Sequence, residues 1–122
     1  MADPVRRFPR WVYGTGDEPD ARFSMANERT FLAWVRTSLA LLAGGVALEA
    51  LDLPVEEHLG LAAALLLVGL GAVCPWVAWW SWARAERAVR EHRPLPAPLG
   101  FALLVVGVGL AGVLVLVGMA LA

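Results

Sequence analysis

Apolar residues along this chain gather into three long runs, at residues 31–51, 59–83 and 99–122. Each run holds twenty or more mostly apolar residues. At about 1.5 Å per residue, a helix of that length crosses the roughly 30 Å hydrocarbon core of a bilayer. The runs do not alternate between apolar and polar positions, as the strands of a membrane barrel would. The pattern therefore predicts an all-α integral membrane protein with three transmembrane helices.

The residues before the first run are polar and rich in residues that interrupt regular structure. Prolines and glycines are spread through this segment, at Pro4, Pro9, Gly14, Gly16 and Pro19. We therefore expect a flexible basic arm over residues 1–23 and a three-helix transmembrane domain over residues 24–122. Ser24 suits the N-cap of the first helix, which is then expected to start outside the hydrocarbon. Arg6 and Arg7 are followed by no apolar run, so we expect no cleaved leader.

Arginine is divided unevenly among the polar segments. The arm and the start of the first helix carry Arg6, Arg7, Arg10, Arg22 and Arg29, and the second loop carries Arg84, Arg87, Arg90 and Arg93. The first loop, residues 52–58, has three acidic residues and no arginine. The positive-inside rule therefore predicts a cytoplasmic N-terminus and second loop, with the C-terminus outside.

The segment after the second apolar run is itself typical of a helix. Residues 79–92 contain neither proline nor glycine, and Glu86–Arg90 and Arg87–Glu91 have the spacing of i,i+4 ion pairs. We expect the second helix to continue by two or three turns and to stop before Pro94. This extension is either a solvated surface that faces lipid headgroups, or a basic collar that concentrates anions at a pore mouth.

Two arginines enter the first apolar run on one face. Arg29 and Arg36 lie seven residues apart, which is about two helical turns, and small residues share their stripe. An arginine at the centre of a membrane helix is unfavourable by roughly 2.5–3.5 kcal/mol. Arg36 therefore either snorkels to the interface or pairs with Glu28 between subunits, or it belongs to a ring that lines a pore. Three helices cannot enclose a lumen alone, so we expect an oligomer.

The third run is rich in glycine, with Gly107 and Ala111 at the spacing of close helix packing. Of the 122 residues, 59% are hydrophobic and 17% are charged, and Cys74 is the single cysteine, so a disulfide framework is excluded. His58 and His92 fall in different loops with no ligand cluster, so no metal site or cofactor is expected. No catalytic motif appears, so we expect no enzyme activity. The basic arm is expected to touch lipid and not nucleic acid.

The run Met25-Ala26-Asn27-Glu28-Arg29-Thr30-Phe31-Leu32-Ala33-Trp34-Val35-Arg36-Thr37-Ser38-Leu39-Ala40-Leu41 resembles the signature of the YidH-like family of small bacterial inner-membrane proteins. This family is classed as a domain of unknown function (number 202). The domain is similar to the membrane part of the fungal vacuolar transporter chaperone complex, where three-helix subunits form a five-membered ring around a polyphosphate path. The resemblance implies pore-facing positions for Arg29 and Arg36, with Glu28 as an acidic partner, and an anion or polyphosphate as the ligand.

These observations predict a multi-pass protein of the bacterial inner membrane that contacts lipids and forms a homo-oligomer, with five subunits favoured and three next. We expect a conduit for anions or phosphate-bearing species lined by Arg29 and Arg36. The supporting residues are expected to be Asn27, Glu28, Arg84 and Arg87. The alternative is a non-conducting scaffold or accessory subunit that organises partners or lipids.

Overall fold

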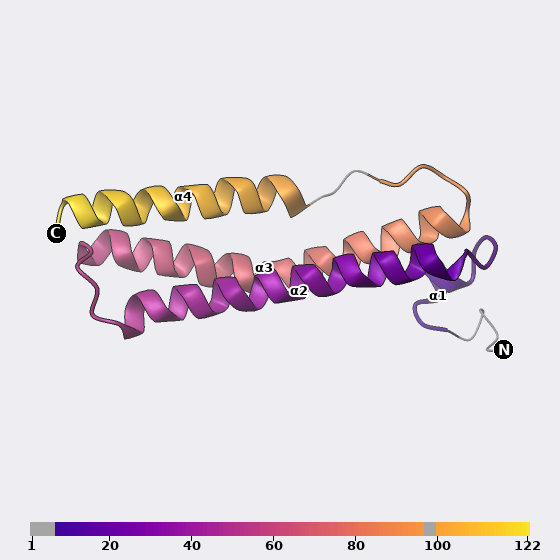
Figure 1. The fold of residues 1–122 in the computed structure, drawn as a ribbon, viewed down its shortest axis with the longest axis horizontal. Helices are drawn as coiled ribbons and strands as arrows, with labels where there is room; N and C mark the ends of the chain where they lie inside the picture. Colours follow the sequence, from indigo (N-terminus) through magenta and orange to yellow (C-terminus); the bar gives the residue numbers. More distant parts are fainter. Residues whose placement is uncertain (1–6, 97–99) are drawn as a thin grey trace.

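The computed structural model describes residues 7–96 and 100–122, and its described residues form helices and connecting segments without a strand. A short helix, α1 (Arg10–Tyr13), precedes three long ones: α2 (Ala21–Ala50), α3 (Glu57–Arg90) and α4 (Gly100–Ala120). In Figure 1, α2 and α3 run antiparallel along most of their length, and α4 lies beside the first half of α3. All three long helices are long and apolar enough to cross a membrane. The all-α, three-span prediction is therefore confirmed, except that residues 1–6 of the arm and Leu99 of the third run lie outside the described residues.

The first long helix starts earlier than its sequence suggests. The N-cap of α2 is Asp20, whose carboxylate accepts a hydrogen bond from the backbone N–H of Arg22 at 2.9 Å. The prediction that Ser24 caps this helix is therefore wrong, because Asp20 satisfies the free N–H groups one turn upstream. The C-terminal end of the second long helix agrees with the prediction, since α3 continues to Arg90 and stops before Pro94.

Close contact between α2 and α3 relies on small and polar residues at their interface. Ser38 is buried and its hydroxyl donates to the backbone carbonyl of Gly71 at 2.5 Å. A Cβ at Gly45 would lie only 2.6 Å from the side chain of Val68. The helices can therefore approach closely enough to bury Leu41 against Cys74.

Glycine and alanine also form the buried face of α4. Gly107 and Ala111 are both buried, and a Cβ at Gly107 would lie 2.4 Å from Leu70 of α3. The prediction that these residues pack tightly is confirmed.

We assign one boundary of the hydrocarbon core to the start of α4, from the length of this helix and the aromatic residues beside it. Its 21 residues span about 31 Å at 1.5 Å per residue, which matches the core of a bilayer. At this end the ring of Trp34 from α2 stacks on Phe101 of α4 with centroids 5.9 Å apart. The part of the molecule beyond this boundary therefore includes residues 21–33 of α2 and most of residues 76–90 of α3. We call this part, together with residues 7–20 and 91–96, the juxtamembrane layer.

The described part of the arm folds back onto the end of α3, although its composition predicts flexibility. Arg90 is 1% exposed, and its guanidinium donates to the carbonyls of Tyr13 at 3.0 Å and Thr15 at 3.1 Å. The Asp17 N–H donates to the carbonyl of Arg90 at 2.9 Å. Between these contacts Gly16 has a φ of 62°, and a Cβ there would lie 2.1 Å from the Arg90 carbonyl oxygen. The glycine that suggested flexibility thus permits a specific turn.

The two ion pairs predicted on α3 have different outcomes. Arg87 pairs with Glu91, with its Nε 2.8 Å from the carboxylate, so that prediction is confirmed. Glu86 and Arg90 do not pair, because Arg90 is occupied by the arm, including Glu18 at 3.3 Å, and Glu86 faces α2. Spacing along one helix identified both pairs as candidates, and contacts with other segments decided which one forms.

Candidate functional site

The two arginines of the first span lie on the side of α2 that faces away from α3. Ser38 and Gly45 mark the packed face of α2. At about 100° per residue, Arg29 and Arg36 are half a turn away from that face. Both arginines are exposed in the single chain, and within the described residues neither makes an ion pair or a side-chain hydrogen bond. Because α4 packs on α3, only its start comes near this side of α2, where Phe101 and Leu104 line an open cavity with Arg29, and both arginines remain exposed.

The arginines bracket the boundary of the core. Trp34 is level with the start of α4, so Arg36 lies about 3 Å inside the boundary and Arg29 about 7.5 Å outside it along the helix axis. Ala33, Ala40 and Ala43 share this side of α2 and are exposed as well. The arginine face is thus a stripe of cationic and small side chains that another molecule can approach closely.

Glu28 does not neutralise these arginines within one chain. Its side chain is exposed, and no ion pair in the described part of the chain includes it. The acidic partnership that the resemblance implies therefore has no counterpart inside the single subunit.

Asn27 belongs to a different cluster from the arginines. Its side-chain amide donates to the carbonyl of Trp82 at 3.0 Å and to the carboxylate of Glu86 at 3.2 Å. The hydroxyl of Ser24 donates to the other oxygen of Glu86 at 2.6 Å. Glu86 is 3% exposed, so these bonds satisfy a carboxylate that is almost fully buried. We call this set the Ser24–Asn27–Glu86 clamp, and it fastens α2 to α3 in the juxtamembrane layer.

The importance of Glu86 is not obvious from the sequence. Its place on α3 suggested a surface ion pair, whereas the residue continues, at spacings of four, the stripe of the buried Cys74 and Ala78 and the half-buried Trp82. A carboxylate on the extension of an apolar stripe is the signal that points to a buried role.

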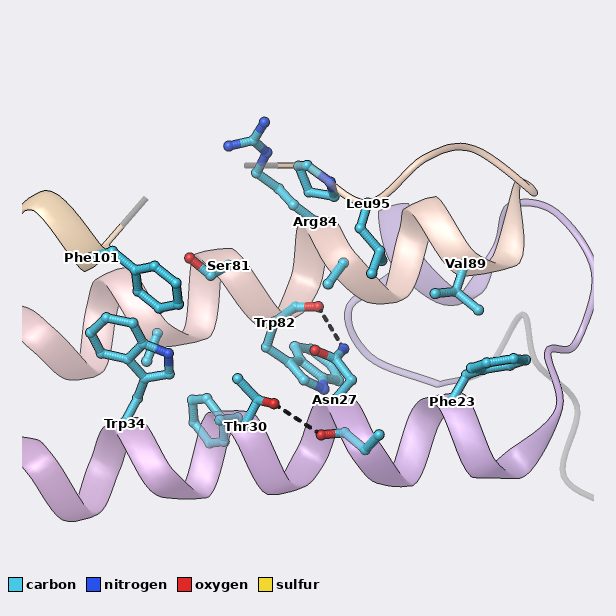
Figure 2. Close-up of a pocket in the computed structure, with 15 residues that line it drawn as sticks. Phe23, Asn27, Thr30, Trp34, Ser81, Trp82, Arg84, Val89, Leu95 and Phe101 are labelled. Carbon is cyan, nitrogen blue, oxygen red and sulfur yellow. Dashed lines mark hydrogen bonds between the residues drawn. The ribbon is translucent and has the colours of Figure 1, made fainter. Parts of the chain in front are cut away.

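Arg84 and Arg87 lie on the same stretch of α3 but have different surroundings. Arg87 pairs with Glu91 and lies over the ring of Trp11, with its Cζ 5.8 Å from the ring centroid. Its hydrogen bond is the main cause that lowers the pKa of Glu91. Arg84 makes no ion pair or side-chain hydrogen bond within the part of the chain that the structure describes. Arg84 lines the edge of a groove, and its guanidinium points away from the aromatic side chains there (Figure 2).

The groove has a volume of about 300 Å³ and lies between α2, α3 and the start of α4. Aromatic side chains make much of its wall: Phe23, Phe31, Trp34, Trp82 and Phe101. Few polar groups face it, and one of them, the hydroxyl of Thr30, donates to the carbonyl of Ala26 at 3.1 Å. The groove is therefore mostly apolar with a cationic edge (Figure 2). No cluster of three metal-ligating side chains occurs in residues 7–96 and 100–122.

Comparison with known proteins places this arrangement in a family. Residues 22–88 match the family model described as "Domain of unknown function (DUF202)". The chain belongs to this family. The match includes Arg29, Arg36 and all three residues of the clamp, whereas it ends before Arg90, which holds the arm.

Relatives are found in two bacterial groups. "Inner membrane protein YidH" of Escherichia coli K12 is 45% identical over 83 residues, which cover 66% of this chain and 71% of that protein. "Uncharacterized protein Rv2272" of Mycobacterium tuberculosis is 43% identical over 110 residues, 84% of each chain. No solved structure matches the chain. Together with the three membrane-spanning helices, the named relative supports the predicted location, and the protein is a multi-pass protein of the bacterial inner membrane.

Proposed function

We propose that this chain forms a homo-oligomeric conduit for anions in the inner membrane, with Arg29 and Arg36 lining the path. One observation carries the proposal. The two arginines lie on a face of α2 that points away from α3, where both remain exposed and have no partner among the described residues.

Contact with lipid is unfavourable at the one charged position of this face that lies inside the core. Arg36 lies inside the apolar boundary, where a charged side chain needs water, an anion or a counter-charge. The neighbouring alanines leave room beside the helix, so the faces of several subunits can meet with water between them. Neighbouring copies of α2 would then shield the arginines from lipid.

A ring built this way favours anions. Each subunit contributes two arginines, one at each of two levels about 10.5 Å apart along the helix axis. At each level, like charges lie close around one axis and repel unless anions screen them. The planar guanidinium, with its several donors, suits phosphate-bearing ions in particular. The family resemblance favours five subunits, with three as the next choice.

The direction of the path follows from the arginine distribution. With the N-terminus in the cytoplasm, the juxtamembrane layer and its arginines lie on the cytoplasmic side. Anions would then approach Arg29 before Arg36.

The test is anion flux into liposomes that contain the purified protein. Arg36→Glu reverses the charge of one ring, so we expect the anion preference of the flux to fall or reverse. The matched control is Arg10→Glu, which makes the same change at an exposed residue of the arm. Native mass spectrometry checks that both variants assemble. Unchanged selectivity in assembled Arg36→Glu contradicts the conduit and favours a non-conducting scaffold or accessory subunit.

A further inference from the structure

A second cavity adjoins the aromatic groove and differs from it in charge. It has a volume of about 210 Å³ and is lined by Trp11, Arg84, Arg87, Ala88, Arg93, Pro94 and Pro96. Arg84 and Pro96 line both spaces, so the groove and this basic cavity meet at one arginine. The structure thus places an apolar compartment and a cationic compartment side by side.

The basic cavity keeps a net positive charge after its internal pairing. Arg87 and Arg93 share the carboxylate of Glu91, at 2.8 and 2.7 Å. Three arginines and one glutamate leave a net charge of +2 (3 − 1 = 2) around the cavity. Arg84 contributes a guanidinium that has no partner within residues 7–96 and 100–122. An anionic group can therefore bind between Arg84 and Arg93 without breaking an existing ion pair.

The aromatic groove leads from this cavity toward the membrane. Trp34 and Phe101 line its membrane end, at the boundary of the hydrocarbon core. Figure 2 shows Arg84 on α3 at some distance from Trp34 and Phe101, which places it on the part of the helix assigned to the juxtamembrane layer. An occupant must therefore be anionic at Arg84 and apolar from there to the core.

We propose that the groove and the basic cavity together bind one anionic phospholipid, with its phosphate at Arg84 and the upper part of an acyl chain along Trp82 and Trp34. A free phosphate ion would use the basic cavity and leave the aromatic groove without an occupant. Phospholipid is present at high concentration at this depth and carries both required parts in the required order. This inference does not depend on the conduit, because Arg84 lies on α3 and outside the arginine face of α2.

The experiment measures lipid retention by native mass spectrometry of the full chain purified in mild detergent and exchanged into defined lipids. The probes are phosphatidylglycerol, phosphatidylcholine and glycerol phosphate. We expect one phosphatidylglycerol per subunit, bound about tenfold more tightly than phosphatidylcholine. Both lipids carry the same phosphate, but the cationic choline of phosphatidylcholine is repelled by the net positive charge of the cavity, whereas the glycerol headgroup is neutral. Arg84→Gln should reduce phosphatidylglycerol binding to the phosphatidylcholine level. Arg22→Gln is its control, because Arg22 is exposed and pairs only locally with Asp20.

A second pair of variants tests the groove itself. Ala85 is half-buried and lines the groove, so Ala85→Leu should fill it and weaken phosphatidylglycerol binding. Ala72→Leu, at an exposed position on the same helix and outside the groove, should leave binding unchanged. Circular dichroism checks that each variant remains helical.

Three results would overturn the proposal. Equal retention of the two phospholipids would show that the site does not select a lipid with a net negative charge. Binding of glycerol phosphate as tight as that of phosphatidylglycerol, unaffected by Ala85→Leu, indicates a free-phosphate site. Loss of subunit assembly in Ala85→Leu with lipid binding intact indicates that a second copy of the chain fills the groove. Because Ala85→Leu leaves every arginine in place, it keeps the test valid even where Arg84→Gln impairs folding.

Discussion

The buried carboxylate of Glu86 is expected to be coupled energetically to Asn27 across the interface of α2 and α3. The perturbation is Glu86→Gln, alone and combined with Asn27→Ala. Glutamine keeps the shape of the side chain; its oxygen can accept from Asn27, and its NH2 group then faces the hydroxyl of Ser24, which can turn to accept. The variant therefore replaces two hydrogen bonds to a carboxylate with weaker bonds to a neutral amide, at a site that is 3% exposed.

The size of the effect follows from the bonds at the clamp. Glu86 accepts from Ser24 at 2.6 Å and from Asn27 at 3.2 Å. A hydrogen bond to a charged group contributes about 1.5–3 kcal/mol, and the longer bond belongs at the low end of that range. We expect Glu86→Gln to lower the free energy of unfolding by about 2–3 kcal/mol. In the Asn27→Ala background the same change should cost about 1–1.5 kcal/mol less, because the bond from Asn27 that it weakens has already been removed.

The assay follows helicity as the fraction of a denaturing detergent is raised in mixed micelles. Thr30→Ala serves as the control for Asn27→Ala, because the Thr30 hydroxyl bonds only to Ala26 within its own helix. Independent sites add within about 0.3–0.5 kcal/mol. Costs of Asn27→Ala and Glu86→Gln that add within that limit would refute the clamp as a coupled unit.

Three further predictions concern the arm and the topology. Gly16→Ala should release the arm and speed its limited proteolysis, because φ is 62° there and a Cβ would meet the Arg90 carbonyl at 2.1 Å; Gly109→Ala, with open space around it, should leave the cleavage rate unchanged. The hydrogen bond from Arg7 lowers the pKa of Glu18 below the ordinary value of a glutamate, so this carboxylate stabilises arm docking above that ordinary pKa and loses the effect as pH falls through the folded pKa. A fluorophore on Arg10→Cys should therefore gain mobility on acidification in the native chain but not in Glu18→Gln, and equal responses would contradict the role of Glu18. A reporter active only in the periplasm should work when fused after Ala122 and stay silent beside Arg93, and activity beside Arg93 would contradict the predicted topology.

Much of the fold could be predicted because it depends on local composition. Hydropathy alone identifies three helices, since no other structure satisfies the backbone of such apolar runs in a bilayer. The packing of Gly107 and Ala111 and the Arg87–Glu91 pair also follow from spacing within one helix.

The contacts that hold the juxtamembrane layer together could not be predicted in the same way. Ser24 and Glu86 are 62 positions apart, and Arg90 and Thr15 are 75 apart, so no local rule relates them. Proline and glycine in the arm indicated flexibility, although Gly16 in fact allows a close turn against Arg90. The arginines of α2 were identified from the sequence as a stripe on one face, and the structure adds that α3 packs on the opposite face.

The central claim is that the arginine faces of several subunits meet around one axis, and cysteine cross-linking in native membranes tests it most directly. Ala40→Cys places a thiol on the exposed arginine face, one turn beyond Arg36, while the native Cys74 is buried. Val105→Cys is the control, at a position of α4 that is 73% exposed and away from that face. The account predicts disulfide-linked dimers for Ala40→Cys under mild oxidation and few for Val105→Cys. The account is contradicted if Ala40→Cys stays monomeric, whether or not Val105→Cys forms cross-linked dimers.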